Sequence, residues 1–223
     1  MRDFPLFTTA YGVASLTLSQ IPYTQKAYIR LQDTLDPELL LKECFDFCRA
    51  VGAETILATG HPVCELFPKY TDVIRMQADK CALGETDAML FPVTEETANR
   101  WQDIYNQKVI HIPNGAWMDA KNMKDEMQRS ACYFVHKNGS LVGIGSVSGQ
   151  QIRWIASVAP GAGKDVVRAL AHAITADTVF LEVASANSKA VALYQALGFV
   201  ATACVSSWYR INKKIETLSR KNT

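Results

Sequence analysis

Apolar positions between residues 151 and 211 switch between the period of a strand and the period of a helix. The run from Val179 to Val183 is typical of a strand, and residues 188–197 carry apolar side chains at helical spacing. Gly198 ends this helix, because glycine adopts the left-handed conformation most easily, and Phe199 can fold back onto the last turn. The pattern predicts strand, loop, helix, hydrophobic corner and a final strand.

A strand, a Gly-rich turn and a helix precede this segment. The strand is expected at Gln151–Pro160, the turn at Gly161–Asp165 and the helix at Val166–Thr175. Glycines let the backbone approach a phosphate closely, and a helix N-terminus offers unpaired N–H groups with a partial positive charge. The layout predicts a phosphate-binding turn, in which Lys164 could reach a phosphate and Asp165 caps the helix. A short connection without a ligand is the alternative.

A nucleotide-triphosphate P-loop is a second interpretation of the same turn, because GAGKD is similar to the end of that motif. The first glycine of the motif would fall at Val158, and its metal-binding hydroxyl would fall at Asp165. Both the tight turn and the metal ligand are therefore missing, and the pattern disfavours this interpretation.

The segment after the second strand resembles the GNAT superfamily of acyl-CoA-dependent N-acetyltransferases. The superfamily has an Asn in the loop, an Ala three residues later, a Leu-Tyr pair and a Gly-Phe corner. The matching residues are Asn187, Ala190, Leu193, Tyr194, Gly198 and Phe199. An ordinary amphipathic helix that ends at a glycine cap is the alternative interpretation.

The resemblance implies that acetyl-CoA is the cofactor and that an amine attacks its thioester directly. The backbone of Ile155, Ala156, Ser157 and Val158 would then hold the pantetheine arm, and Asn187 would bind the arm or an ordered water. The implied pyrophosphate contacts come from the Gly-rich turn and the start of the helix, at Gly161, Ala162, Gly163, Lys164, Asp165 and Val166.

Two side chains receive catalytic roles from the same resemblance. Tyr194 would protonate the leaving thiolate, which suits a phenol because its ordinary pKa of about 10 lies above that of a thiol. Glu182 is a candidate base for the amine, and a backbone N–H near Val158 could polarise the thioester carbonyl. His111, His136 and His172 are weighed as bases too, but each is more typical of a surface or core position.

The first part of the chain repeats part of this order. Its acidic DTLDPE turn replaces the Gly-rich one and would repel a pyrophosphate. Residues 1–85 are therefore interpreted as a truncated GNAT-like half-repeat that does not bind acyl-CoA, or else as an unrelated α/β cap. The expected elements are strands at Tyr11–Ser19, Ala27–Gln32, Thr55–Ala58 and Asp72–Met76, a helix at Asp36–Val51, a short helix or turn near Pro62–Phe67, and a polar linker at Gln77–Thr86.

Residues 86–223 match the order of a full GNAT domain. The resemblance implies an α/β (α+β) fold with a mixed, mostly antiparallel central sheet flanked by helices, next to the N-terminal α/β half-domain. The remaining expected elements are strands at Met89–Pro92, Cys132–Lys137 and Leu141–Ser148, and helices at Thr94–Asn106 and Trp117–Gln128.

Composition makes several classes of binding partner unlikely. The 223 residues are 48% hydrophobic and 20% charged with a net charge of +1, and no basic cluster indicates nucleic acid. The six cysteines lack zinc-binding spacing, and no segment approaches the roughly 18 apolar residues of a membrane span. A cytoplasmic protein with free thiols and no membrane or metal partner is expected.

The acceptor is expected to be a small amine or an amino-acid-like molecule, bound near Trp101–Arg129 and a late loop at Cys204–Tyr209. A homodimer is left open. The Gly-rich turn matches the superfamily pattern only with a short deletion, and this departure supports an alternative function. The alternative is a non-catalytic module that binds acyl-CoA or another protein.

Overall fold

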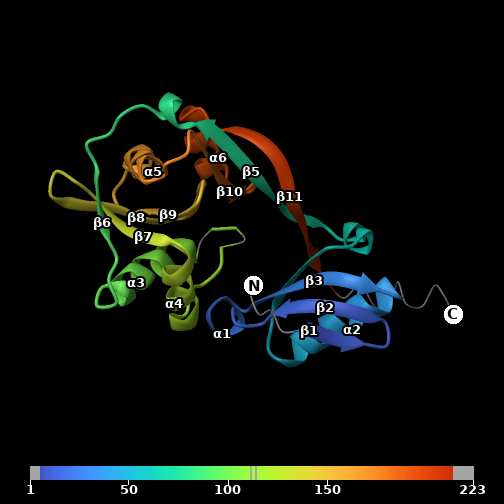
Figure 1. Ribbon diagram of the computed structural model, residues 1–223. Coiled ribbons are helices and arrows are strands. Elements are labelled where there is room, and N and C mark those ends of the chain that lie inside the picture. The colour runs from blue at the N-terminus through green and yellow to red at the C-terminus, as the bar shows by residue number, and fades with distance from the viewer. Residues whose placement is uncertain (1–5, 111, 114, 213–223) are drawn as a thin grey trace. The chain divides into compact units, whose positions relative to one another are not determined.

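The computed structural model describes residues 6–110, 112–113 and 115–212, which divide into two units (Figure 1). Unit 1 joins the chain up to Val73 to the segment from Val205 onward, and unit 2 is Ile74–Cys204. Two strands, β5 (Lys69–Asp79) and β11 (Val200–Ile211), belong partly to each unit. The compact units thus have other bounds than the expected division between residues 85 and 86. Which segments fold independently stays a prediction.

Unit 1 contains a sheet in the order β1-β2-β3-β4-β11-β5. Asp36 begins its long helix by accepting a hydrogen bond from the Leu39 N–H at 3.0 Å, and Pro37 fits the first helical position. The buried face of this helix packs on β2 and β3. The other elements are β1 (Leu6–Thr9), β2 (Gly12–Thr17), α1 (Ile21–Thr24), β3 (Lys26–Thr34), α2 (Pro37–Ala50), β4 (Thr55–Thr59) and the 3-10 helix η1 (Pro62–Leu66).

Strands β3 and β4 are parallel and stay together along the whole of β4. Their register begins at Lys26 and Thr55 and continues to Arg30 and Thr59. Ile56 and Ala58 face the same core as α2. The parallel strands β3 and β4 of unit 1 therefore do not part anywhere along β4.

Unit 2 contains a sheet in the order β6-β7-β8-β9-β10-β5-β11. The pairs from β6 to β9 are antiparallel, and β9 with β10 is parallel. Its further elements are the 3-10 helix η2 (Lys80–Leu83), β6 (Met89–Pro92), α3 (Ala98–Val109), α4 (Ala120–Arg129), β7 (Ala131–Lys137), β8 (Ser140–Ser148), β9 (Gln151–Ser157), α5 (Gly163–His172), β10 (Thr178–Ala184) and α6 (Ser188–Ala196).

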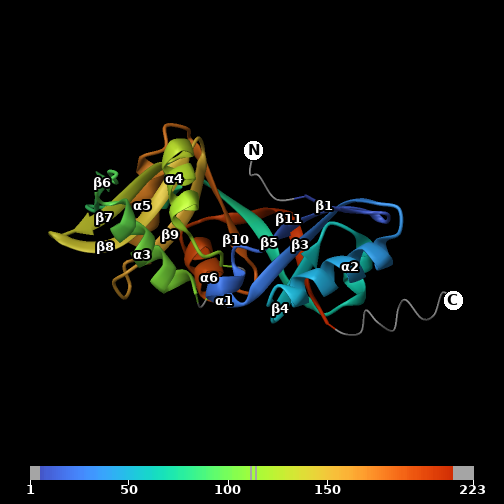
Figure 2. The same cartoon turned by 90° about the horizontal axis from the view of Figure 1, so that it is seen from below.

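Helices cover both faces of this sheet (Figure 1 and Figure 2). Trp101 of α3 and Met123 of α4 form a core with Ile144 on one face. Val167 of α5 and Leu197 after α6 form the other core with β10. The expected fold class, a mixed and mostly antiparallel sheet flanked by helices, is confirmed.

The expected linker at Gln77–Thr86 is wrong. Strand β5 continues to Asp79, and the turn η2 follows it. Met76, Ala78 and Leu83 are buried in the core of unit 2, while Gln77 and Asp79 are exposed. Buried and exposed residues alternate here as in a half-buried strand, but the polar composition of the segment is more typical of a linker.

Three helices begin elsewhere than expected. Thr97 Oγ1 accepts from the Thr94 N–H at 2.9 Å, so a turn precedes α3 and the helix starts at Ala98. Asp119 accepts from the Asn122 N–H at 2.7 Å and delays α4 to Ala120. The third helix, α5, starts earlier, at Gly163.

The expected corner after α6 is confirmed. Gly198 has a φ of +92°, and the Phe199 N–H donates to the Tyr194 carbonyl at 3.0 Å. The expected loop at Cys204–Tyr209 is wrong, because these residues are part of β11. None of the helices in the described ranges is long and apolar enough to cross a membrane.

Candidate functional site

Strands β9 and β10 part shortly after they begin. Their register in the described chain holds two pairs, Gln151 with Phe180 and Ile152 with Leu181. Beyond them, β9 stays paired with β8 as far as Ser157. The later residues of β9 therefore have a strand on one side only.

A bulge marks the point of parting. Ser146 pairs with Trp154 and Val147 pairs with Ile152, so Arg153 is an extra residue in β9. Such a bulge bends the strand and increases its local twist. The change of direction lies next to the last pair that β9 makes with β10.

A buried ion pair holds this bulge. Arg153 Nε and Nη2 donate to Glu126 of α4 at 2.9 and 3.1 Å, and Ser146 Oγ donates to the same carboxylate at 2.8 Å. Burial tends to raise the pKa of Glu126, but hydrogen bonds, above all from Arg153, outweigh it and the pKa is lowered. The sequence analysis missed these residues, because charges distant in the chain give no local signal of burial.

The backbone of β9 has two edges with different partners. The Val158 N–H donates to the Val142 carbonyl at 2.9 Å, so this group faces β8. The N–H expected to polarise a thioester is thus occupied, and that part of the prediction is wrong for Val158. Because N–H groups alternate along a strand, those of Ile155 and Ser157 face the edge that β10 has left, whereas Ala156 faces β8.

The Gly-rich turn follows at the end of β9. Gly161 has a φ of +79°, which favours glycine. A Cβ on Gly163 would lie 2.8 Å from Leu193 Cδ2, so the turn packs against α6. The glycines therefore set both the direction of the chain and its approach to the neighbouring helix.

The N-terminus of α5 has no side-chain cap. Ala162 is its N-cap residue, and the first helical bond is the 3.0 Å bond from the Val166 N–H to the Ala162 carbonyl. The N–H groups of residues 163–165 precede this bond and have no intrahelical acceptor. The Lys164 side chain is exposed beside them. The Val166 side chain is fully buried and its N–H is bonded to Ala162, and its contact with a ligand stays a prediction.

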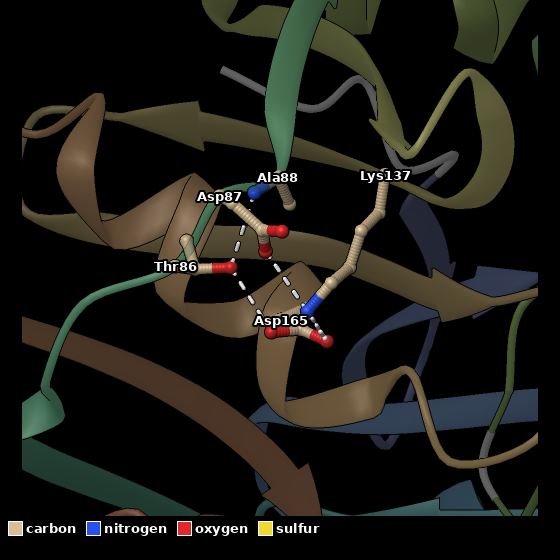
Figure 3. Close-up of polar contacts among 5 residues, drawn as sticks. All are labelled: Thr86, Asp87, Ala88, Lys137 and Asp165. Carbon is tan, nitrogen blue, oxygen red and sulfur yellow. Dashed lines mark hydrogen bonds and ion pairs between the residues drawn. The ribbon is translucent and has the colours of Figure 1, made fainter.

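Asp165 does not cap α5, contrary to expectation. Its Oδ1 accepts from Thr86 Oγ1 at 3.0 Å and its Oδ2 accepts from Lys137 Nζ at 3.1 Å (Figure 3). Lys137 also pairs with Asp87 at 2.9 Å. The hydrogen bond from Lys137 lowers the pKa of Asp87, and the bonds to Asp87 and Asp165 raise the pKa of Lys137.

Asn187 and Tyr194 lie at the start and near the end of α6. Asn187 Oδ1 accepts from the Ala190 N–H at 3.3 Å, so the side chain caps the helix. Tyr194 is buried, its ring centre is 5.9 Å from that of Phe199, and its hydroxyl has no hydrogen bond to another described residue. Burial raises the pKa of Tyr194 to about 12, because it disfavours the phenolate.

Glu182 is the first residue of β10 after the last pair with β9. Leu181 and Val183 face the core under α5 and α6, so the alternation of the strand turns Glu182 to the opposite face. Its Oε1 accepts from Arg75 Nη2 at 2.8 Å, and the Arg75 guanidinium lies 4.7 Å from the Phe180 ring centre. Sequence reasoning missed Arg75, because β5 was assigned to the preceding half.

The histidines lie apart from this point. The His136 ring contacts the Phe91 ring at a tilt, with ring centres 4.8 Å apart, and His172 is exposed at the end of α5. His111 lies outside the described residues. The structure thus brings together Glu182, the open edge of β9 and the parting of β9 from β10, whereas His136 and His172 lie on β7 and at the end of α5.

Solved structures similar to this chain were found at low sequence identity. A conserved protein of unknown function from Staphylococcus epidermidis has a TM-score of 0.59 and 13% identity over 94% of both chains. Two structures from Kribbella flavida, both GCN5-related N-acetyltransferases, have TM-scores of 0.59 and 0.55 at 11% and 8% identity. They match 91% and 97% of this chain, over 58% and 93% of their own lengths.

No protein-family model and no curated protein matches the sequence. At identities this low, the similarity to these structures shows a shared fold and nothing further.

Proposed function

We propose that this chain, which has the fold of the GNAT superfamily, is an N-acetyltransferase that moves an acetyl group from acetyl-CoA to a primary amine. The observation that carries the proposal is the parting of β9 from β10 after two pairs, beside a helix N-terminus without a cap. A strand edge with free amides and a group of unpaired N–H donors together suit a ligand with amides at one end and phosphates at the other.

The residues on the edge of β9 that β10 leaves unpaired fit acetyl-CoA as the acyl donor. Ile155 and Ser157 direct backbone N–H and C=O groups toward the place that β10 leaves, and an extended pantetheine arm could pair with them as a strand does. The N–H groups of residues 163–165 and the Lys164 ammonium are the donors proposed for the pyrophosphate. When bound, acetyl-CoA supplies the acetyl group as a thioester.

Two side chains have proposed roles in proton transfer. Glu182 accepts a proton from the amine as the nitrogen attacks, and Tyr194 donates its proton to the sulfur as the carbon–sulfur bond breaks. Both groups later exchange their protons with solvent. A phenol is already protonated at neutral pH, as an acid requires, and burial raises the pKa of Tyr194 further, to about 12. Glu182 would act while paired with Arg75.

A non-catalytic acyl-CoA-binding module remains the second candidate. Two observations favour it: the Val158 N–H is bonded to Val142 rather than free to polarise a carbonyl, and Glu182 is paired with a guanidinium. Under this alternative, the open edge binds the ligand and no acetyl transfer follows. For the catalytic function, the proposed acceptor is a small amine or an amino-acid-like molecule. A non-catalytic module would have no acceptor.

Calorimetric titration with desulfo-CoA, acetyl-CoA and ATP tests the proposal. We expect micromolar binding of both CoA compounds and none of ATP, followed by acetylation of at least one amine from a panel of small amines and amino acids. Binding without transfer to any amine would favour the non-catalytic module. Absence of CoA binding would reject both candidates.

A further inference from the structure

The first turn of α5 carries a carboxylate beside the N–H groups proposed to bind phosphates. Asp165 lies three residues after the N-cap Ala162. An acidic side chain at this position can reach back to the N-cap N–H, and its charge repels an anion that approaches the helix start. In this chain the helix start is nevertheless left without a side-chain cap.

Hydrogen bonds from other segments hold both oxygens of Asp165 elsewhere. Thr86 Oγ1 donates to Oδ1 at 3.0 Å and itself accepts from the Ala88 N–H at 3.2 Å. Lys137 Nζ donates to Oδ2 at 3.1 Å (Figure 3). The carboxylate is thus attached to the segment before β6 and to the end of β7.

Lys137 occupies a fixed place for this contact. It is the last residue of β7, and the tight turn that follows has positive φ angles of +52° at Asn138 and +76° at Gly139. Its ammonium also pairs with Asp87 at 2.9 Å. The Lys137 ammonium therefore reaches Asp165 and Asp87 from the start of a short hairpin turn.

We propose that Lys137 is a positioning residue for the acyl donor. It neutralises Asp165 and, together with Thr86, turns that carboxylate away from the first N–H groups of α5, which leaves these donors free for the pyrophosphate of CoA. The inference rests on the proposed function, because it assigns a role within the same donor site. Lys137 need not touch the ligand.

The test is calorimetric titration of desulfo-CoA into the full chain and its variants at low ionic strength. Lys137→Gln leaves Asp165 uncompensated, and we expect CoA to bind about fivefold more weakly. Lys121→Gln removes an exposed lysine from α4 with the same change of net charge, and it should bind as the wild type does. Lys137→Arg keeps the charge and should retain most of the affinity.

A second substitution separates charge compensation from the other roles of Lys137. Adding Asp165→Asn to Lys137→Gln removes the uncompensated carboxylate, and the affinity should return to within about twofold of wild type. Added salt should shrink the defect of Lys137→Gln as well. A defect that persists in the double variant and in salt would overturn the proposal, because Lys137 would then contact the ligand or shape the turn.

If Lys137→Gln does not fold, the single substitution Asp165→Asn tests the proposal instead. This variant should bind CoA at least as tightly as the wild type, and a several-fold loss would overturn the proposal by showing that the carboxylate itself contributes to binding. Equal binding by Lys137→Gln and the wild type would overturn the inference and leave the proposed function standing. Absence of CoA binding by the wild type would instead reject the proposed function, and the inference with it.

Discussion

Arg75 Nη2 and Glu182 Oε1 form an ion pair at 2.8 Å, between neighbouring strands β5 and β10. Both side chains are partly exposed, so the pair adds less than about 1 kcal/mol to the free energy of unfolding. Its effect on chemistry is larger, because Glu182 lies where β9 and β10 part. A strand from before residue 86 thus supplies the partner of the proposed base.

Glu182→Gln tests that role. If the carboxylate accepts the proton of the amine, the substitution should lower kcat/KM by about a hundredfold or more, while desulfo-CoA binding stays unchanged. Glu85→Gln, an exposed carboxylate of the same unit, is the matched control and should keep full activity. Unaltered turnover in Glu182→Gln would show that Glu182 is not the base.

Tyr194→Phe should lower kcat while desulfo-CoA affinity stays the same, because the hydroxyl is proposed to act on the leaving sulfur. The free energy of unfolding should change by about 1 kcal/mol or less, since the hydroxyl makes no hydrogen bond to another described residue. Kinetics with a reactive amine and thermal unfolding measure the two effects. A variant as active as the wild type would leave Tyr194 as a packed aromatic.

Gly163→Glu should abolish CoA binding. The new side chain would meet Leu193, whose Cδ2 is 2.8 Å from the Cβ position, and its charge would lie at the start of α5. Gln128→Glu adds the same charge at an exposed position of α4 and should leave CoA binding unchanged. Titration should show lost binding only for Gly163→Glu, and intact binding there would place the phosphates elsewhere.

A truncated chain that begins at Thr86 should aggregate or expose apolar surface. It lacks β5 and η2, which contribute Met76, Ala78 and Leu83 to the core of unit 2. A chain that begins at Lys69 keeps these residues and should be more soluble. Soluble yield and binding of a hydrophobic dye distinguish the two, and a folded, monomeric chain from Thr86 would show that unit 2 does not need β5.

Alkaline pH should destabilise the protein. Burial raises the pKa of the Cys44 and Cys48 thiols from 9.0 to about 12, so the unfolded chain loses these protons first. The stability that this difference provides is complete below pH 9.0 and is lost as the pH rises toward about 12, by up to about 1.4 kcal/mol per pH unit for each thiol.

Urea unfolding of the reduced protein, followed across this pH range, measures the slope. Cys44→Ala with Cys48→Ala should flatten it, although the small cavities lower the stability at neutral pH. Cys81→Ala changes an exposed thiol and should keep the wild-type slope. The same slope in all three proteins would show that other groups dominate.

The sequence analysis identified the elements with strong local signals. Asn187, Tyr194 and the Gly198 corner lie within one strand–helix–strand segment, and periodicity sufficed for it. The last three residues of β5 were missed, because the exposed Gln77 and Asp79 resemble linker residues when the burial of Ala78 is unknown.

The parting of β9 and β10 could not be predicted from spacing. It depends on which residues pair across strands and on Arg153, whose bulge is held by Glu126 from a different helix. The resemblance placed Val158 at the reaction centre, but only the pairing of β8 shows that its N–H is occupied. Contacts of this kind link distant parts of the chain and leave no local pattern.

The two units become complete at different times during synthesis. Unit 2 is continuous from Ile74 to Cys204, whereas unit 1 contains the part of β11 that pairs with β4. Translation proceeds from the N-terminus, so the segment up to Val73 must wait for the residues after Cys204 before its sheet can close. Until Tyr209 and its neighbours have been synthesised, the edge of β4 lacks its native partner and can pair with a strand of another chain.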